Sequence, residues 1–288
     1  MIVDPPATAI ASSALLYALG RRRMAGSRQR REGRWRAQAF YAGLAALVLA
    51  LEPPLDKLAD RLFWAHMLQH MLLQMVVPPL LVLGAPWLPV WREFPLSGRR
   101  RVGHWLAGSR GASPLRFAAS ILARPAVAWV LFIGTIALSH LPRVFDFALR
   151  NTAFHEGEHA LFLGLGLLFW SRALDSPPSR ARLHPPGAVV FFLSAVVAES
   201  LLALVIMGAR SPLYAPYVAL VPRPEGLSAL ADQQFGGALM LEPASLPLLI
   251  ALLWSIKRWV GQTSAMPSPR LARGVTGQEP RAVFRGRQ

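Results

Sequence analysis

Long apolar runs separated by short basic segments most limit what this chain can fold into. Seven such runs cover roughly residues 5–20, 37–52, 63–84, 125–141, 154–173, 187–208 and 235–256. Most of them approach the length of about 20 apolar residues that a helix needs to cross a bilayer. Charged residues make up only 16% of the chain, whereas soluble domains carry about a quarter. The sequence therefore predicts an all-α polytopic membrane protein with seven transmembrane helices.

The distribution of basic residues predicts the orientation of these helices. Of the 31 Lys and Arg residues, 25 lie in the four segments 21–36, 85–124, 172–186 and 257–288. Segments rich in Lys and Arg remain in the cytoplasm, so the N-terminus is expected outside and the C-terminus inside. Because the formal charge of +16 is concentrated between the apolar runs, it indicates membrane topology, and we expect no nucleic acid partner.

The chain is expected to form one membrane domain with a short tail. Residues 1–258 make up the predicted seven-helix domain, and the basic residues 259–288 are expected to be a disordered cytoplasmic tail. Pro78-Pro79 lies inside the third run, where it should kink the helix or end its regular hydrogen bonding. The absence of Cys excludes thiolate metal sites and disulfides.

Two histidine pairs with i,i+4 spacing are the strongest functional signal. His66 and His70 form one pair, His155 and His159 the other, and each pair lies on one face of its predicted helix. In the predicted topology both pairs and His140 lie near the outer membrane surface. Ionisable residues inside a membrane are costly and usually functional. The histidines therefore predict a shared metal site, with Asp232 as a further candidate ligand.

Other residues are candidate ligands or candidate groups that orient ligands. Neutral imidazoles suit copper, zinc and haem iron, and thioethers suit Cu(I). Carboxylates can orient a ligating histidine, and buried carboxylates near the middle of a membrane are functional candidates. The candidates of these kinds are Glu158, Gln233, Gln234, Met67, Met71, Met240, Glu199 and Glu242.

Several stretches in order make the chain similar to the CtaG family of caa-type cytochrome c oxidase assembly factors. They are residues 66–73 with 78–86, 140–142, 155–170, and 212–214 through 226–228 to 232–237. The similarity covers roughly residues 35–258. It implies a multi-pass protein of the bacterial plasma membrane that helps to mature haem–copper oxidase, with copper delivery as the expected chemistry. The implied partners are an oxidase subunit or another copper chaperone, besides the lipid bilayer. The family positions carried over are His66, His70, His140, His155, His159, Asp232, Gln233 and Gln234.

Two alternatives to a non-enzymatic copper protein remain open. A membrane electron-transfer protein could bind haem between histidines of the third and fifth predicted helices. The residues His155, Glu156 and His159 also match the H-E-x-x-H pattern of zinc proteases, although a pattern this short often matches by chance. We therefore expect copper as the metal, with haem or zinc as the alternatives.

Overall fold

The computed structural model describes residues 5–23, 27–177, 181–220, 226–242 and 245–264, and every regular element in these ranges is helical. This confirms the predicted all-α class. The elements are α1 (Pro5–Arg23), α2 (Ser27–Leu51), α3 (Leu55–Ala59), α4 (Phe63–Met71), η1 (Leu72–Val76), α5 (Val77–Gly84), α6 (Trp87–Glu93), α7 (Leu96–Gly108), η2 (Arg110–Ala112), α8 (Ser113–Leu122), α9 (Pro125–Ser139), α10 (Pro142–Arg150), α11 (Thr152–Ala173), α12 (Pro185–Met207), α13 (Ala215–Val218), α14 (Ala229–Leu241) and α15 (Leu246–Ser264).

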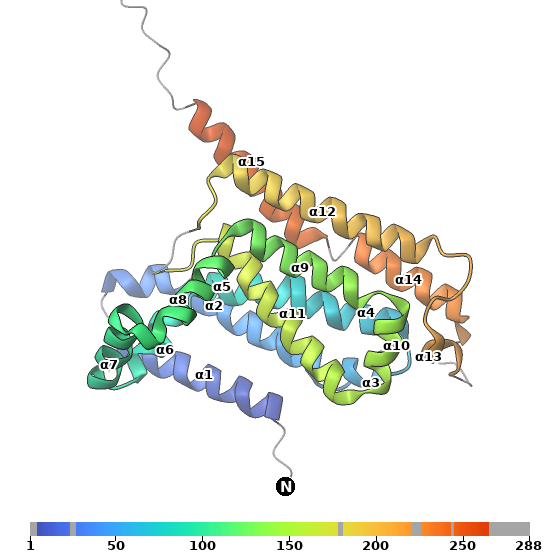
Figure 1. Ribbon diagram of the computed structural model, residues 1–288, viewed down its shortest axis with the longest axis horizontal. Helices are drawn as coiled ribbons and strands as arrows, with labels where there is room; N and C mark the ends of the chain where they lie inside the picture. Colours follow the sequence, from blue (N-terminus) through green and yellow to red (C-terminus); the bar gives the residue numbers. More distant parts are fainter. Residues whose placement is uncertain (1–4, 24–26, 178–180, 221–225, 243–244, 265–288) are drawn as a thin grey trace, which may run out of the picture.

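The continuous unit of α4, η1 and α5 forms the centre of the bundle (Figure 1). Helices α2, α3, α11 and α14 all pack against parts of this unit. Helix α12 packs on α9, α14 and α15, while α1 lies against α2 and α6. The third apolar run of the sequence therefore forms the innermost helical unit, and α2, α3, α11 and α14 pack around it.

The central unit loses its regular hydrogen bonding where the sequence predicts it. A π-helical segment, η1, precedes Pro78-Pro79, and α5 resumes at Val77. Proline has no N–H, so Pro78 cannot donate to the carbonyl of Gln74. The indole Nε1 of Trp170 on α11 donates to that carbonyl instead, at 3.1 Å. The interruption thus joins α11 to the centre of the bundle.

A glycine allows α11 to approach this interruption closely. A Cβ atom at Gly166 would lie 2.6 Å from Cγ of Pro78 and 3.3 Å from the carbonyl oxygen of Gln74. Any larger residue would push α11 away from the central unit, because interiors are close-packed. Gly166 therefore sets the spacing between the two helices that carry the histidine pairs.

Three stretches are long and apolar enough to cross a membrane, namely Phe63–Gly84, Pro185–Met207 and Ala229–Thr263, the last of which takes in both α14 and α15. A fourth is possible where Arg110–Leu122 joins Pro125–Ser139 at a bend of 77°. The predicted spans at 5–20, 37–52 and 154–173 are helical but do not meet this criterion.

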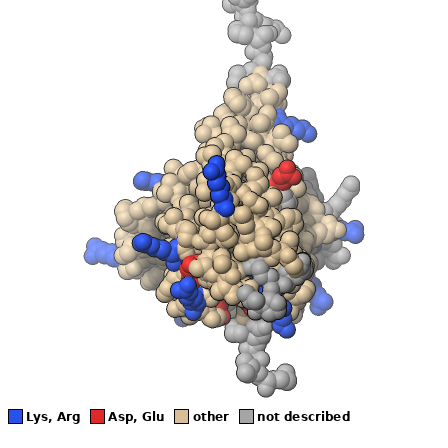
Figure 2. All heavy atoms as spheres, turned by 90° about the vertical axis from the view of Figure 1, so that its right-hand side faces the viewer, with Lys and Arg blue, Asp and Glu red and all other residues tan. Residues whose placement is uncertain are grey.

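Figure 2 looks onto the end of the molecule near α10, α13 and α14, where side chains other than Lys, Arg, Asp and Glu cover most of the face.

The C-terminal boundaries differ from the prediction. The run at 235–256 belongs to two helices, because α14 ends at Leu241 and α15 begins at Leu246. The predicted tail was expected to be disordered from residue 259, but α15 remains helical to Ser264. Apolar residues such as Trp259 and Val260 continue the helix past the basic pair Lys257-Arg258. The rest of the predicted tail, 265–288, lies outside the described residues.

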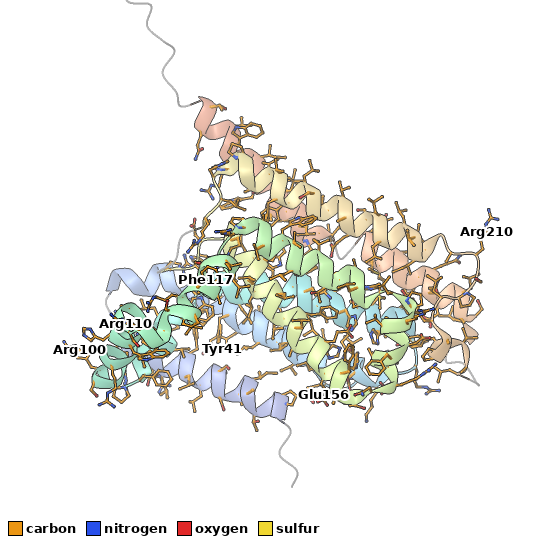
Figure 3. All side chains as sticks on the ribbon, in the orientation of Figure 1. Tyr41, Arg100, Arg110, Phe117, Glu156 and Arg210 are labelled. Carbon is orange, nitrogen blue, oxygen red and sulfur yellow. The ribbon has the colours of Figure 1, made fainter. Side chains whose placement is uncertain are left out.

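Helices α7 and α8 form an outlying unit at one end of the molecule, and no residue of either is buried. The guanidinium of Arg116 on α8 donates to the carbonyls of Leu106 and Ser109, which ties the two helices together. Figure 3 shows Arg100 and Arg110 at this end, whereas Glu156 and Arg210 lie toward the other end. The histidine pairs belong to the latter end, on α4 and at the start of α11.

Candidate metal centre

Four histidine side chains meet between α4 and α11. Within the pairs, the ring centroids of His66 and His70 and of His155 and His159 are each 4.2 Å apart. Between the helices, His66 lies 5.0 Å from His155, and His70 lies 5.3 Å from His159. We call these four residues the four-histidine cluster. The structure brings together both pairs that the sequence singled out, as two walls of one site.

Local structure places His66 and His155 near the starts of α4 and α11, and the second histidine of each pair follows one turn later. Asn151 precedes α11 as its N-cap, and its side-chain oxygen accepts a hydrogen bond from the N–H of Phe154 at 3.0 Å. Helix α4 begins at Phe63, three residues before His66. Because both helices start at the same end of the bundle, the pairs lie at the same depth.

Ring nitrogens of three histidines in the cluster converge, and four nitrogens of the cluster are buried without a hydrogen-bond partner in the described part of the chain. One ring nitrogen from each of His66, His70 and His155 lies within 4.8 Å of the others. Both nitrogens of His70, and Nε2 of His155 and His159, are buried without a hydrogen-bond partner. A buried polar atom without a partner costs about 1–3 kcal/mol. A metal ion bound to these nitrogens would remove that cost.

The cluster has a buried side and a side near the surface. His66 and His70 are fully buried, whereas His155 is partly exposed. The carboxylates of Asp56 and Asp60 lie close enough to His155 to interact with it electrostatically. Burial raises the pKa of Asp60, and so does Asp56, whereas His155 lowers it. Acidic groups thus lie beside the exposed imidazole, where a cation would enter.

His140, the fifth predicted ligand, is buried at the end of α9 and lies outside the four-histidine cluster. Its Nδ1 is 2.8 Å from the carbonyl oxygen of Ile136, and its Nε2 is 3.4 Å from Sδ of Met67. Its ring contacts Phe145, which also contacts the ring of His66. Phe145 therefore lies next to both His140 and the cluster.

Asp232 is buried, and both of its oxygens accept hydrogen bonds from the backbone. The N–H of Phe63 donates to Oδ2 at 2.9 Å, and the N–H of Trp64 donates to Oδ1 at 3.0 Å. The first N–H groups of a helix have no partner within that helix. The predicted ligand Asp232 is therefore seen to cap α4, and its charge suits the positive end of the helix dipole.

The amides next to Asp232 also lie away from the cluster. Gln233 accepts a hydrogen bond from the N–H of Leu213 at 2.6 Å and donates to the carbonyl of Ile206 at 3.1 Å. Gln234 is exposed. The structure thus shows Gln233 tying α14 to α12 and to the loop that follows it.

The remaining candidates fall into three kinds of environment. Glu158 is buried on α11, and Glu199 is buried on α12 with Oε2 unpartnered. Glu242, predicted to be buried near mid-bilayer, is exposed in the structure at the end of α14, because the helix stops there. The predicted thioethers of Met67, Met71 and Met240 lie in one apolar cluster with Phe63, Phe145, Tyr214 and Tyr217.

The chain that carries these site residues matches a known protein family. A model of the cytochrome c oxidase caa3 assembly factors matches residues 15–262. The chain belongs to this family. The match is longer than the 35–258 predicted from the motifs, and it includes every residue of the four-histidine cluster.

Relatives of the chain occur in mycobacteria. Uncharacterized proteins of Mycobacterium bovis and Mycobacterium tuberculosis are each 27% identical over 268 residues, which cover 90% of this chain and 40% of the relative. An uncharacterized protein of Mycobacterium leprae is 27% identical over 230 residues, 79% of this chain and 34% of the relative. The chain thus spans less than half the length of these relatives. No solved structure matches it significantly.

Residues that carry no signal in the sequence also support the four-histidine cluster. Gln69, between the two histidines of α4, donates to the carbonyl of Ala50 at 2.8 Å and to Asp56 at 3.1 Å. Phe162 on α11 contacts the ring of His70. For a third residue, Trp170, the sequence does carry a signal. Pro78 leaves the carbonyl of Gln74 without its helical donor, so a donor from another helix, here Trp170, is needed.

Proposed function

We propose that this chain helps to assemble a haem–copper oxidase in the bacterial plasma membrane by holding copper in the four-histidine cluster. Membership of the caa3 assembly factor family supports the assembly role. The observation that carries the copper proposal is His70, which is fully buried with both ring nitrogens unpartnered. Copper is the cargo in this proposal, and an oxidase subunit or another copper chaperone is the partner.

The donor set fits a copper ion. The three converging imidazoles of His66, His70 and His155 suit Cu(I), Cu(II) or Zn(II), His159 lies beside them, and the chain has no thiolate. A cluster with one partly exposed member, His155, allows an ion to enter and leave. The acidic groups Asp56 and Asp60 would attract a cation to that member. This arrangement supports transfer of the ion rather than permanent storage.

The cluster offers less support for haem. Its four rings contact one another, and Phe145 and Phe162 pack against His66 and His70. A bis-histidine haem needs two imidazoles on opposite faces of a wide, flat ring system. A zinc protease would use Glu156, and this residue is exposed on α11. The closely grouped rings therefore favour a single ion.

Seven transmembrane helices with the N-terminus outside remain part of the proposal. In that topology the cluster lies near the outer membrane surface, because α4 and α11 both begin there. The excess of Lys and Arg in the alternate segments supports it. Cysteine scanning with a membrane-impermeant reagent on the naturally Cys-free chain would test it. Labelling at position 156 but not at position 100 in intact cells is the expected result.

Metal analysis tests the copper proposal directly. The purified chain and its His70→Ala variant would be compared by elemental analysis and visible spectroscopy, with His104→Ala as a control because His104 is exposed on α7. Copper should be present in the wild type and the control and at least about tenfold lower in His70→Ala. A Soret band that disappears in His70→Ala would instead support haem.

The assembly role needs a test in cells. Strains carrying His70→Ala or His104→Ala would be compared for copper in the purified oxidase, at equal levels of the assembly factor in the membrane. The His70→Ala strain should yield oxidase depleted in copper, and the control should not. Normal oxidase copper in the His70→Ala strain would rule out delivery through the cluster.

A further inference from the structure

His140 and Met67 form a buried contact outside the four-histidine cluster. Nε2 of His140 lies 3.4 Å from Sδ of Met67, and the two residues are 5% and 0% exposed. They come from different helices, since His140 ends α9 and Met67 lies in α4. The contact therefore depends on the tertiary structure.

The hydrogen bonds of His140 assign the ring proton to Nδ1. A carbonyl oxygen can only accept, so the 2.8 Å contact with Ile136 requires a proton on Nδ1. The Ser139 hydroxyl also lies 3.2 Å from Nδ1, but it donates to the same Ile136 carbonyl at 2.8 Å, so Nδ1 is assigned the role of donor. A neutral imidazole protonated at Nδ1 has a lone pair at Nε2. That lone pair faces Met67.

The Met67 sulfur cannot complete a hydrogen bond with this lone pair. A thioether has no proton, so two electron-pair donors face each other in an apolar environment. Aromatic side chains surround them, including Phe63, Phe145 and Tyr214. A cation bound to both donors would convert a mismatched contact into a favourable one.

Both donors are held in place by neighbouring groups. The hydroxyl of Tyr214 donates to the carbonyl of His140 at 3.2 Å, which anchors the residue at the end of α9. Gly236 on α14 packs closely against Met67, since a Cβ atom there would lie 3.2 Å from Cγ of Met67. A metal-binding histidine usually donates its other N–H to a carbonyl or carboxylate. His140 shows this arrangement through Ile136.

We propose that Nε2 of His140 and Sδ of Met67 form a second metal site, selective for a soft monovalent cation such as Cu(I). The thioether disfavours Zn(II) and Cu(II) relative to Cu(I). Two neutral donors in an apolar environment also suit a single positive charge. The site deepens the proposed copper function by assigning an oxidation state to one bound ion. The four-histidine cluster, which has no sulfur, remains the other site.

Cu(I) titration of the purified full-length chain tests the proposal. Binding would be measured in detergent without oxygen against a chromogenic Cu(I) chelator, followed by X-ray absorption at the copper edge. Met67→Leu should lose one bound Cu(I) and the sulfur signal. His70→Ala should lose a different Cu(I) and keep the sulfur signal. Met71→Leu is the matched control, because Met71 lies one turn further along α4 in the same apolar cluster.

The outcomes separate this site from the four-histidine cluster. A sulfur signal that survives in His70→Ala but not in Met67→Leu supports the second site, even if the cluster binds no copper. Absence of sulfur around copper in the wild type, or equal loss in Met67→Leu and Met71→Leu, overturns it. Nitrogen NMR of histidine-labelled chain gives an independent test. A proton on Nε2 of His140 in the metal-free protein would also overturn the proposal.

Discussion

The four-histidine cluster and Asp232 are both buried polar sites that the sequence marked as metal ligands, yet they differ in their partners. Both oxygens of Asp232 accept backbone hydrogen bonds at the start of α4. Both nitrogens of His70, within the same helix, have none. Buried polar groups are nearly always satisfied, so an unpartnered group points to a ligand. The comparison shows that burial alone does not distinguish a structural group from a binding group.

Removing the Asp232 carboxylate should have the largest effect, and the effect should be on stability. Asp232→Ala loses two buried, charge-assisted hydrogen bonds, at about 1.5–3 kcal/mol each. We expect the free energy of unfolding to fall by about 3–6 kcal/mol, measured by denaturant unfolding in detergent. Asp232→Asn keeps one acceptor and should lose about half as much. If Asp232→Ala stayed stable but lost copper, Asp232 would belong with the ligands.

Removing the His70 imidazole is expected to raise the stability of the metal-free protein, whereas removing the Asp232 carboxylate lowers it. His70→Leu replaces a buried, unpartnered imidazole with an apolar side chain, which should stabilise the metal-free protein by about 1–3 kcal/mol. The same variant should lose the stabilisation that copper confers on the wild type. Thermal unfolding with and without Cu(I) measures both effects. A less stable metal-free variant would mean that His70 has a structural role like that of Asp232.

Gly166 tests whether the spacing of α11 controls the cluster. Gly166→Ala should cost about 1–3 kcal/mol by overpacking against Pro78. It should also weaken copper binding, because α11 carries half of the cluster. Gly164→Ala is the control, since a Cβ atom there meets nothing within 4 Å. Comparable stability and copper affinity in the two variants would disprove the role of Gly166.

The smallest effect is expected at Asp60, beside the exposed side of the cluster. Because the pKa of Asp60 is raised, its contribution to stability is present at low pH and is lost as pH rises through that pKa. Wild type should thus lose stability relative to Asp60→Asn above about pH 4, by no more than about 0.5 kcal/mol because solvent screens this exposed carboxylate. Bound copper should reduce this difference, which unfolding at several pH values would show. A difference independent of pH would contradict the expectation.

Much of the helical structure could be predicted because its signals are local. Helices were correctly expected at all seven apolar runs, and Pro78-Pro79 marked the interruption of the central one. The i,i+4 spacing predicted that each histidine pair shares a face, and charge counting predicted that the pairs share one end. The division of the last run into α14 and α15 was missed, because apolar composition alone does not show where a helix ends.

The sequence by itself determined the helical class, the family and the two histidine pairs, since these depend on composition, spacing and order along the chain. Only the tertiary structure decided which polar groups have partners. Asp232 meets the start of α4 across 169 residues of sequence, and Met67 meets His140 across 73. Such contacts depend on how helices pack, because a side chain's own sequence neighbours do not specify what lies opposite it.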